Sequence, residues 1–486
     1  MFLLLYYVYL LPLFITATCQ FSRYDYVETE EGDVYNIIAR TSGGEEALIN
    51  PHGGAIALLS TTRVVYSDGN RDLVLAVLSH IFKKDYKGNQ YYMGDIIRMA
   101  KNDLGIGETN KLNFTLLGDP ATKLVYPEFR VFTDSINHMS IDQGLDTLKA
   151  FSLITVSGYV AYDDSTVIED FNGFVYPQVY DKKIEVTTFA NDPDMYPFVY
   201  YDQKNLLYKG EATVTNGRFH FSFIVPKDIS YNIGFGKISY YAENGLIDAK
   251  GEFRGVLVGG TDDDPADDFS GPDIDLFMND NRFVDGGITD SNPYIYAELF
   301  DEMGVNTSGV GIGHDIVAIL DDDYQEQYIL NDYYEATVDD YKSGIVLYQL
   351  KDIEEGEHFL SLKVWDVYNN SSEASINFVV KNGGGFVLES VYNYPNPTNE
   401  YTTFQYTHNA PEEDHEVTLE VFDLSGRLVT RISETRYESG YVSNPLVWNL
   451  KSSGNSYLAP GVYPYRLRVK TSLGTAYINQ KLIIIR

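Results

Sequence analysis

Apolar residues recur along this chain at two different spacings, and the spacing changes near residue 140. Before that point, continuous apolar runs typical of buried strands alternate with segments that have the 3.6-residue period of amphipathic helices. This order predicts a mostly parallel sheet with helices on its faces over residues 12–130. The expected elements are strands at 13–18, 55–59 and 113–117, helices at 72–83 and 93–104, and a short helix opened by a capping box at Ser42-Gly43-Gly44-Glu45.

After residue 140 the helical period stops, and short alternating strands separated by turn residues take its place. Glycine-rich and acidic segments at 259–265 and 381–385 are typical of linkers. The pattern therefore predicts β-sandwiches in series. The clearest strands are expected at 154–159, 218–224, 237–241, 359–365, 374–380, 417–422, 461–469 and 481–485.

Composition narrows the possible functions. The 486 residues are enough for about three or four domains. The formal net charge of −34 argues against binding nucleic acid or an anionic membrane through a basic surface. A single cysteine, Cys19, excludes an intrachain disulfide framework, a Cys₄ zinc site and a CxxC redox motif.

The uncharged segment 2–18 allows two interpretations. It has the length of a targeting segment, but it contains no Lys or Arg and is interrupted by Pro12. Alternatively, Leu13–Thr18 forms a buried strand of the predicted sheet.

Cys19 is the candidate nucleophile, because it follows a predicted strand and active sites gather at the carboxyl ends of strands in such sheets. A buried structural cysteine is the alternative. Three histidines are weighed as its base: His52 in a turn, His80 in a helix and His314 in a Gly-His-Asp segment. Each also fits an ordinary turn or helix position, so none is assigned.

Two acidic clusters are candidate calcium ligands, since calcium prefers several oxygen donors. They are Asp262-Asp263-Asp264 with Asp267-Asp268, and Asp321-Asp322-Asp323. Neither matches an EF-hand loop, and solvated linkers or turns are the alternative. We therefore assign no cofactor and keep calcium as an open possibility.

Several segments, taken in order, resemble a known family. The segment Thr16–Asp25 around Cys19 is similar to the nucleophile region of gingipain-like cysteine peptidases, and more closely to that of the type IX secretion sortases of Bacteroidetes. Near the other end, the sequence resembles the C-terminal sorting domain of type IX cargo proteins. Further matching segments are 53–58, 60–64, 94–98, 113–120, 221–227, 311–315, 364–370, 393–397, 424–426 and 460–463.

This resemblance implies both a fold and an activity. The fold is the C-terminal part of a caspase/gingipain-like α/β domain at 1–133, a β-rich domain at 134–260, an immunoglobulin-like β-sandwich at 261–383 and a sorting β-sandwich at 384–486. The activity is that of a cysteine peptidase and transpeptidase at the outer membrane. It removes the sorting domain from cargo through a thioester on Cys19 and joins the cargo to a lipopolysaccharide amine. The implied partners are cargo proteins, outer-membrane secretion components and lipopolysaccharide.

The chain departs from the family in one respect. The family's catalytic histidine precedes the cysteine, whereas none of the 18 residues before Cys19 is a histidine. We therefore expect the chain to be the C-terminal part of a longer protein and a poor catalyst by itself. The alternatives are a noncatalytic cell-surface β-sandwich protein, or a complete enzyme that pairs Cys19 with His52 or His314.

Overall fold

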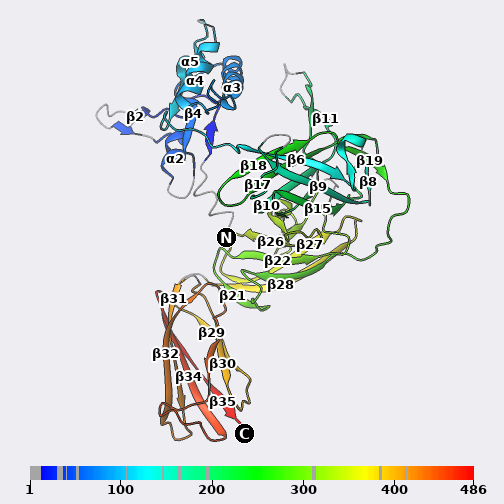
Figure 1. The fold of residues 1–486 in the computed structure, drawn as a ribbon. Helices are drawn as coiled ribbons and strands as arrows, with labels where there is room; N and C mark the ends of the chain where they lie inside the picture. Colours follow the sequence, from blue (N-terminus) through cyan, green and yellow to red (C-terminus); the bar gives the residue numbers. More distant parts are fainter. Residues whose placement is uncertain are drawn as a thin grey trace. The chain divides into compact units, whose positions relative to one another are not determined.

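The computed structural model describes residues 12–485, apart from 30–36, 40, 51–53, 106, 145–146, 163–165, 192–195, 309–312, 382–385 and 412. The chain divides into two compact units, residues 1–126 and 127–486. The described part of the first unit contains four α-helices, and the second unit is built mostly of strands (Figure 1). The predicted boundary at 133/134 falls inside strand β6 (Phe129–Ile136).

The first unit is organised around strand β4, whose five residues are all buried. Strand β1 pairs with it in parallel, as the apolar runs predict, but β5 pairs with it antiparallel. The described sheet is therefore of mixed direction, because β5 begins opposite the end of β4 and runs back along it. The elements are β1 Leu13–Ile15, β2 Val27–Thr29, β3 Ile37–Ala39, α2 Gly43–Ile49, β4 Ala57–Thr61, α3 Ser67–Ile81, α4 Met93–Asp103, α5 Asn110–Asn113 and β5 Phe114–Leu117.

Helices α3 and α4 pack through apolar residues at helical spacing. Leu73 and Val77 of α3 and Ile96 of α4 lie in one core with Leu59 of β4. Their i, i+4 spacing puts the apolar positions of each helix on one face, which is why periodicity locates both helices. Among the described residues, no helix is long and apolar enough to span a membrane.

The first β region, residues 127–261, contains a nine-stranded sheet and a three-stranded sheet that share one core. Along β9 (Leu153–Ala161) buried and partly exposed residues alternate, as expected for a sheet with one covered face. The other strands are β6 Phe129–Ile136, β7 Met139–Ser140, β8 Leu148–Ala150, β10 Gly173–Tyr180, β11 Ile184–Thr187, β12 Val199–Asp202, β13 Leu206–Lys209, β14 Ala212–Val214, β15 Arg218–Ile224, β16 Gly234–Phe235, β17 Lys237–Glu243, β18 Asp248–Phe253 and β19 Leu257–Thr261.

The second β region, residues 273–380, contains a four-stranded and a five-stranded sheet around one core. Buried residues of β22, in the four-stranded sheet, and of β27, in the five-stranded sheet, belong to this core. An immunoglobulin-like strand order stays a prediction. The strands are β20 Asp273–Met278, β21 Gly287–Thr289, β22 Tyr294–Phe300, β23 Val317–Leu320, β24 Gln327–Ile329, β25 Tyr334–Ala336, β26 Ser343–Gln349, β27 Gly356–Trp365 and β28 Ser371–Val380.

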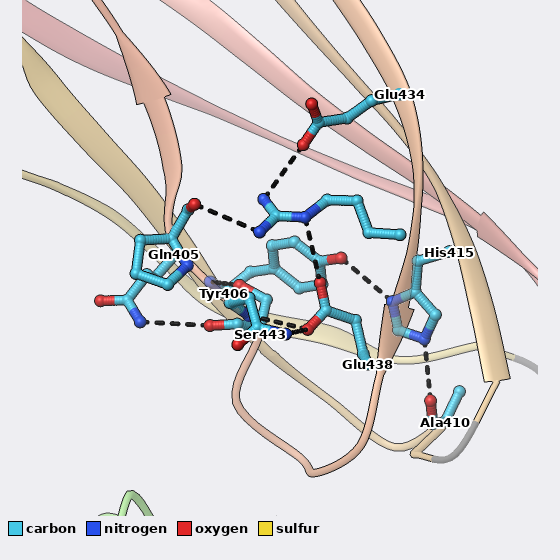
Figure 2. Close-up of polar contacts among 10 residues, drawn as sticks. Gln405, Tyr406, Ala410, His415, Glu434, Glu438 and Ser443 are labelled. Carbon is cyan, nitrogen blue, oxygen red and sulfur yellow. Dashed lines mark hydrogen bonds and ion pairs between the residues drawn. The ribbon is translucent and has the colours of Figure 1, made fainter.

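The third β region, residues 386–484, again packs two sheets around one core. Its interior includes a polar cluster in which the Tyr406 hydroxyl donates to His415 Nδ1 at 3.0 Å and His415 Nε2 donates to the Ala410 carbonyl at 2.8 Å (Figure 2). The strands are β29 Leu388–Tyr394, β30 Thr402–His408, β31 Glu413–Phe422, β32 Leu428–Glu438, β33 Leu446–Trp448, β34 Gly461–Thr471 and β35 Gly474–Ile484.

A candidate nucleophile beyond strand β1

Cys19 lies four residues beyond β1, at the carboxyl end of the parallel β1/β4 pair. Its side chain is exposed, and the Sγ–H donates to the Val65 carbonyl at 3.4 Å. The expectation of a cysteine beyond the strand is therefore confirmed, although the strand ends at Ile15 instead of Thr18 and none of its three residues is buried. The alternative of a buried structural cysteine is wrong. An exposed thiol at this edge can be reached by a substrate.

The loop that carries Cys19 is tied to the last two residues of β4. The Thr16 and Ser60 hydroxyls lie 2.6 Å apart, and the Thr61 hydroxyl donates to the Thr18 carbonyl. Ser22 N–H then donates to the Thr61 carbonyl at 3.0 Å. Because these bonds lie on both sides of Cys19, the position of the thiol is set by β4 as well as by its own strand.

The first turn of α3 also supports this loop. Asn70 is buried, and its Nδ2 donates to the Ala17 carbonyl at 3.2 Å. Its Oδ1 accepts a hydrogen bond from Asn110 at 3.3 Å. The sequence prediction started α3 at Asp72 and missed this turn. Asn70 binds loop backbone instead of packing in an apolar core, and Ser67 and Asp68 are exposed, so apolar periodicity does not reveal this turn.

Helix α2 approaches the loop from the other side at two glycines. A Cβ on Gly44 would lie 2.0 Å from Ser22 Oγ, and one on Gly43 would lie 2.9 Å from the Phe21 ring. The predicted capping box that opens α2 is present, with Glu45 accepting from Ser42 N–H at 2.9 Å. The Gly-Gly pair therefore allows the start of the helix to pack directly against the residues after Cys19.

One ion pair closes the same loop. Arg63 binds both carboxylate oxygens of Asp25, at 3.0 and 2.6 Å. The hydrogen bond and charge of Arg63 hold the pKa of Asp25 below its ordinary value. Asp25 is therefore held as a carboxylate by Arg63.

Among the residues that the structure describes in the first unit, no histidine lies beside Cys19. His80 bonds Asp103 at 2.6 Å near the end of α3. It lies about 20 Å along the helix from Ser67, where α3 begins next to the Cys19 loop. His52 falls outside the described residues.

His314 belongs to the second unit, where its Nδ1 lies 2.5 Å from Asp228 Oδ2 and its ring contacts the Trp365 ring in a tilted arrangement, with 4.4 Å between the ring centroids. This histidine therefore already has a carboxylate partner and an aromatic neighbour in its own unit.

The two predicted acidic clusters differ in whether their carboxylates can share a metal ion. Within the described part of the chain, one group of carboxylates is close enough to share a metal ion, and it consists of Asp268, Asp301 and Asp366. Only Asp268 comes from the predicted clusters. Asp321 instead accepts hydrogen bonds from His358 and from the backbone of Phe359.

Known families match both ends of the chain. The family described as peptidase family C25 matches residues 4–125, which include Cys19 and the sheet around it. The family described as a secretion system C-terminal sorting domain matches residues 392–484, most of the third β region. A comparison with curated proteins gave no match.

Two of the solved structures that the chain resembles are cysteine peptidase relatives by name or by family. Dimeric latent PorU from Porphyromonas gingivalis is 32% identical over 89% of this chain, with a TM-score of 0.36. This chain spans 41% of that PorU chain. The Arg-specific cysteine proteinase gingipain R is 13% identical, matching 51% of this chain and 45% of its own, with a TM-score of 0.20. The two family matches and the identity to PorU, and not the superpositions, establish the relationship. The chain is therefore a PorU-like protein that joins a segment of peptidase family C25 to a secretion system C-terminal sorting domain.

Proposed function

We propose that this chain carries the nucleophile of a type IX secretion sortase, and that Cys19 is the residue that becomes acylated. The observation that carries the proposal is the position of Cys19. The only cysteine of the chain is exposed beyond β1, inside the segment that matches peptidase family C25. The sorting domain at residues 392–484 supports a secreted or cell-surface location.

The proposed reaction has two steps at the sulfur atom. The Cys19 thiolate attacks the scissile carbonyl carbon of a cargo protein, and the C–N bond breaks as the departing amine takes a proton. The cargo is then held as a thioester. An amine of lipopolysaccharide attacks this thioester, which forms an amide and returns the sulfur as a thiol, whereas attack by water gives simple hydrolysis.

Both steps need a general base and an oxyanion stabiliser. The Cys19 thiol donates a hydrogen bond to the Val65 carbonyl, which cannot act as a base at neutral pH. The Gln20 N–H already donates a hydrogen bond to the Arg63 carbonyl at 3.4 Å, so it is not free to stabilise an oxyanion. We propose that the base is a histidine that this chain does not itself supply, and that the chain alone is a poor catalyst.

The proposal is tested in the organism that expresses the protein. Cys19→Ala is introduced, and mass spectrometry follows a secreted cargo protein and its sorting domain. We expect Cys19→Ala to leave the sorting domain attached and to abolish amide formation with lipopolysaccharide. Ser22→Ala is the matched loop control. It removes a buried hydroxyl oxygen that has no hydrogen-bond partner among the described residues, so we expect processing to continue. Normal processing with Cys19→Ala contradicts the proposal and favours a noncatalytic cell-surface protein.

A second measurement concerns the base. The purified 486-residue chain is incubated with a cargo peptide, alongside His52→Ala and His314→Ala variants. We expect little cleavage by any of them. Efficient cleavage that is lost in either histidine variant would show that the base lies within this chain.

A further inference from the structure

Three carboxylates from separate segments converge at one end of the second β region. Asp301 directly follows β22, Asp366 directly follows β27, and Asp268 lies in the segment that leads into β20. One oxygen of each lies within 4.8 Å of the others. Three acidic groups at this spacing repel one another unless a proton or a cation lies among them.

The charges of this cluster have no compensating cation among the residues that the structure describes. Asp366 is completely buried and Asp301 is 6% exposed, yet no lysine or arginine forms an ion pair with any of the three. Burial, together with the nearby carboxylates, raises the pKa of Asp301 to about 6 and of Asp366 to about 7. Buried charge without a counter-charge is unfavourable, so this arrangement needs an explanation.

One oxygen of the cluster lacks a hydrogen-bond donor among the described residues. Asp268 Oδ2 is buried and accepts no hydrogen bond there, and the Asp268 carboxyl lies within hydrogen-bonding reach of the Asp366 carboxyl. The other carboxylate oxygen of Asp268 is held by the backbone of its own segment. Backbone N–H groups fix all three side chains: Met303 and Gly304 donate to Asp301, Tyr368 and Asn370 to Asp366, and Ser270 to Asp268.

We propose that Asp268, Asp301 and Asp366 bind a divalent cation of the calcium class. A hard cation prefers oxygen donors, and the three carboxylates supply only oxygens. Such an ion gives Asp268 Oδ2 the partner that it lacks and neutralises most of the converging charge. Calcium fits better than magnesium because donors from three irregular segments suit its flexible geometry, whereas magnesium needs near-ideal octahedral ligands.

The position of the site gives the ion a structural role. The turn after Asp366 contacts the first β region, because the Lys227 N–H donates to the Val367 carbonyl at 2.9 Å and Asn369 Nδ2 donates to Asp228 at 2.8 Å. Asp268 belongs to the segment that connects the same two regions. A bound cation therefore fixes the connecting segment to the end of the second β region, next to its contact with the first.

The experiment uses the full chain, stripped with a chelator and then titrated with Ca²⁺ at pH 7.5. Trp365 precedes Asp366, so its fluorescence, measured in a Trp448→Phe background, reports unfolding at the site. We expect Ca²⁺ at 100 times its dissociation constant to raise the unfolding midpoint by several degrees. The connecting segment 262–272 should also be cleaved more slowly by an added protease.

Matched variants assign the effect to the site. In Asp268→Asn the hydrogen bond from Ser270 can be kept while the ligand charge is lost, so the Ca²⁺ shift should disappear. Without metal, this variant should be at least as stable as wild type, because it removes one repelling charge. Asp267→Asn removes the same charge from the exposed neighbouring residue and should keep the full Ca²⁺ shift.

Two results would overturn the proposal. One is an equal Ca²⁺ shift in wild type and Asp268→Asn, which places the ion elsewhere. The other is no Ca²⁺ shift in wild type, which means that shared protons satisfy the carboxylates instead.

Discussion

Cys19 is an exposed thiol whose hydrogen has a backbone acceptor and whose loop is fixed from three sides. The carbonyls of Ala17 and Thr18 accept hydrogen bonds from Asn70 and Thr61, and Ser22 packs against Gly44. None of these contacts supplies a base. The described residues of the first unit therefore position the sulfur atom, and under the proposed function its proton transfer needs a base that none of these contacts provides.

A second residue-scale feature is a buried histidine in the sorting domain. His408 is 2% exposed, and its Nδ1 accepts a hydrogen bond from the Ala410 N–H at 3.3 Å. Within the described part of the chain, its Nε2 has no hydrogen-bond partner. Burial lowers the pKa of His408 to about 3, with the nearby His415 and Arg282 acting in the same direction. His408 is therefore neutral in the folded protein.

This histidine predicts acid sensitivity. The unfolded chain binds a proton at His408 near pH 6.5 but the folded chain only near pH 3. The contribution of His408 to the free energy of unfolding is thus fully present above about pH 6.5. It is lost as the pH decreases below that value, by at most about 1.4 kcal/mol per pH unit. Unfolding followed by Trp448 fluorescence in a Trp365→Phe background should show this loss.

His408→Gln should flatten the pH dependence between pH 4 and 6, since glutamine does not titrate. His220→Gln, at an exposed position of β15, should leave the dependence unchanged. If both variants keep the slope of the parent protein, another group causes the acid sensitivity.

At the scale of elements, α2 shows how a short helix can be defined by local sequence. It has only seven residues, and isolated helices of that length are unstable in water. The capping box satisfies its first N–H groups, and the backbone and hydroxyl of Ser42 together keep the pKa of Glu45 below its ordinary value. The cap is a local motif, so the sequence predicted it.

Removal of this cap should weaken the first unit. Ser42→Ala leaves the Glu45 N–H without its acceptor and should reduce the free energy of unfolding by about 1 kcal/mol. Denaturant unfolding followed by circular dichroism at 222 nm measures the change. Ser42→Thr retains a hydroxyl acceptor and should lose much less. Equal stability of all three proteins would mean that packing alone holds α2.

Other elements were predicted only in part. Strand β4 and helix α4 follow from a continuous apolar run and a 3.6-residue period, and both occur. The sequence pattern did not predict the polar first turn of α3 or the antiparallel direction of β5. Both depend on partners distant in the sequence, namely the Cys19 loop and the end of β4.

At the scale of the whole molecule, the chain consists of two compact units with different spectroscopic signals. All α-helices of the described chain lie in residues 1–126, and both tryptophans, Trp365 and Trp448, lie in the second unit. Ellipticity at 222 nm therefore follows mainly the first unit, and tryptophan fluorescence follows only the second.

We predict that the two signals report different unfolding midpoints, because each unit has its own core. Leu59→Ala, in the core of the first unit, should reduce the free energy of unfolding measured at 222 nm by about 2–5 kcal/mol. The unfolding transition measured by fluorescence should not change. Leu362→Ala, in the second unit, should do the reverse. Coincident transitions that both variants shift together would show a single cooperative unit.

The sequence by itself determined the features that arise from neighbouring residues: the main strands, helices α3 and α4, the cap of α2 and the position of Cys19 just past a strand. It also determined the family, through segments spread along the chain. Tertiary structure alone decided which side chains meet. Asp268, Asp301 and Asp366 are as much as 98 residues apart, and only the pairing of strands brings their carboxylates together. Likewise, the end of β4, the residues after it and the start of α3 hold the Cys19 loop in place through hydrogen bonds that join residues 39 to 53 positions apart.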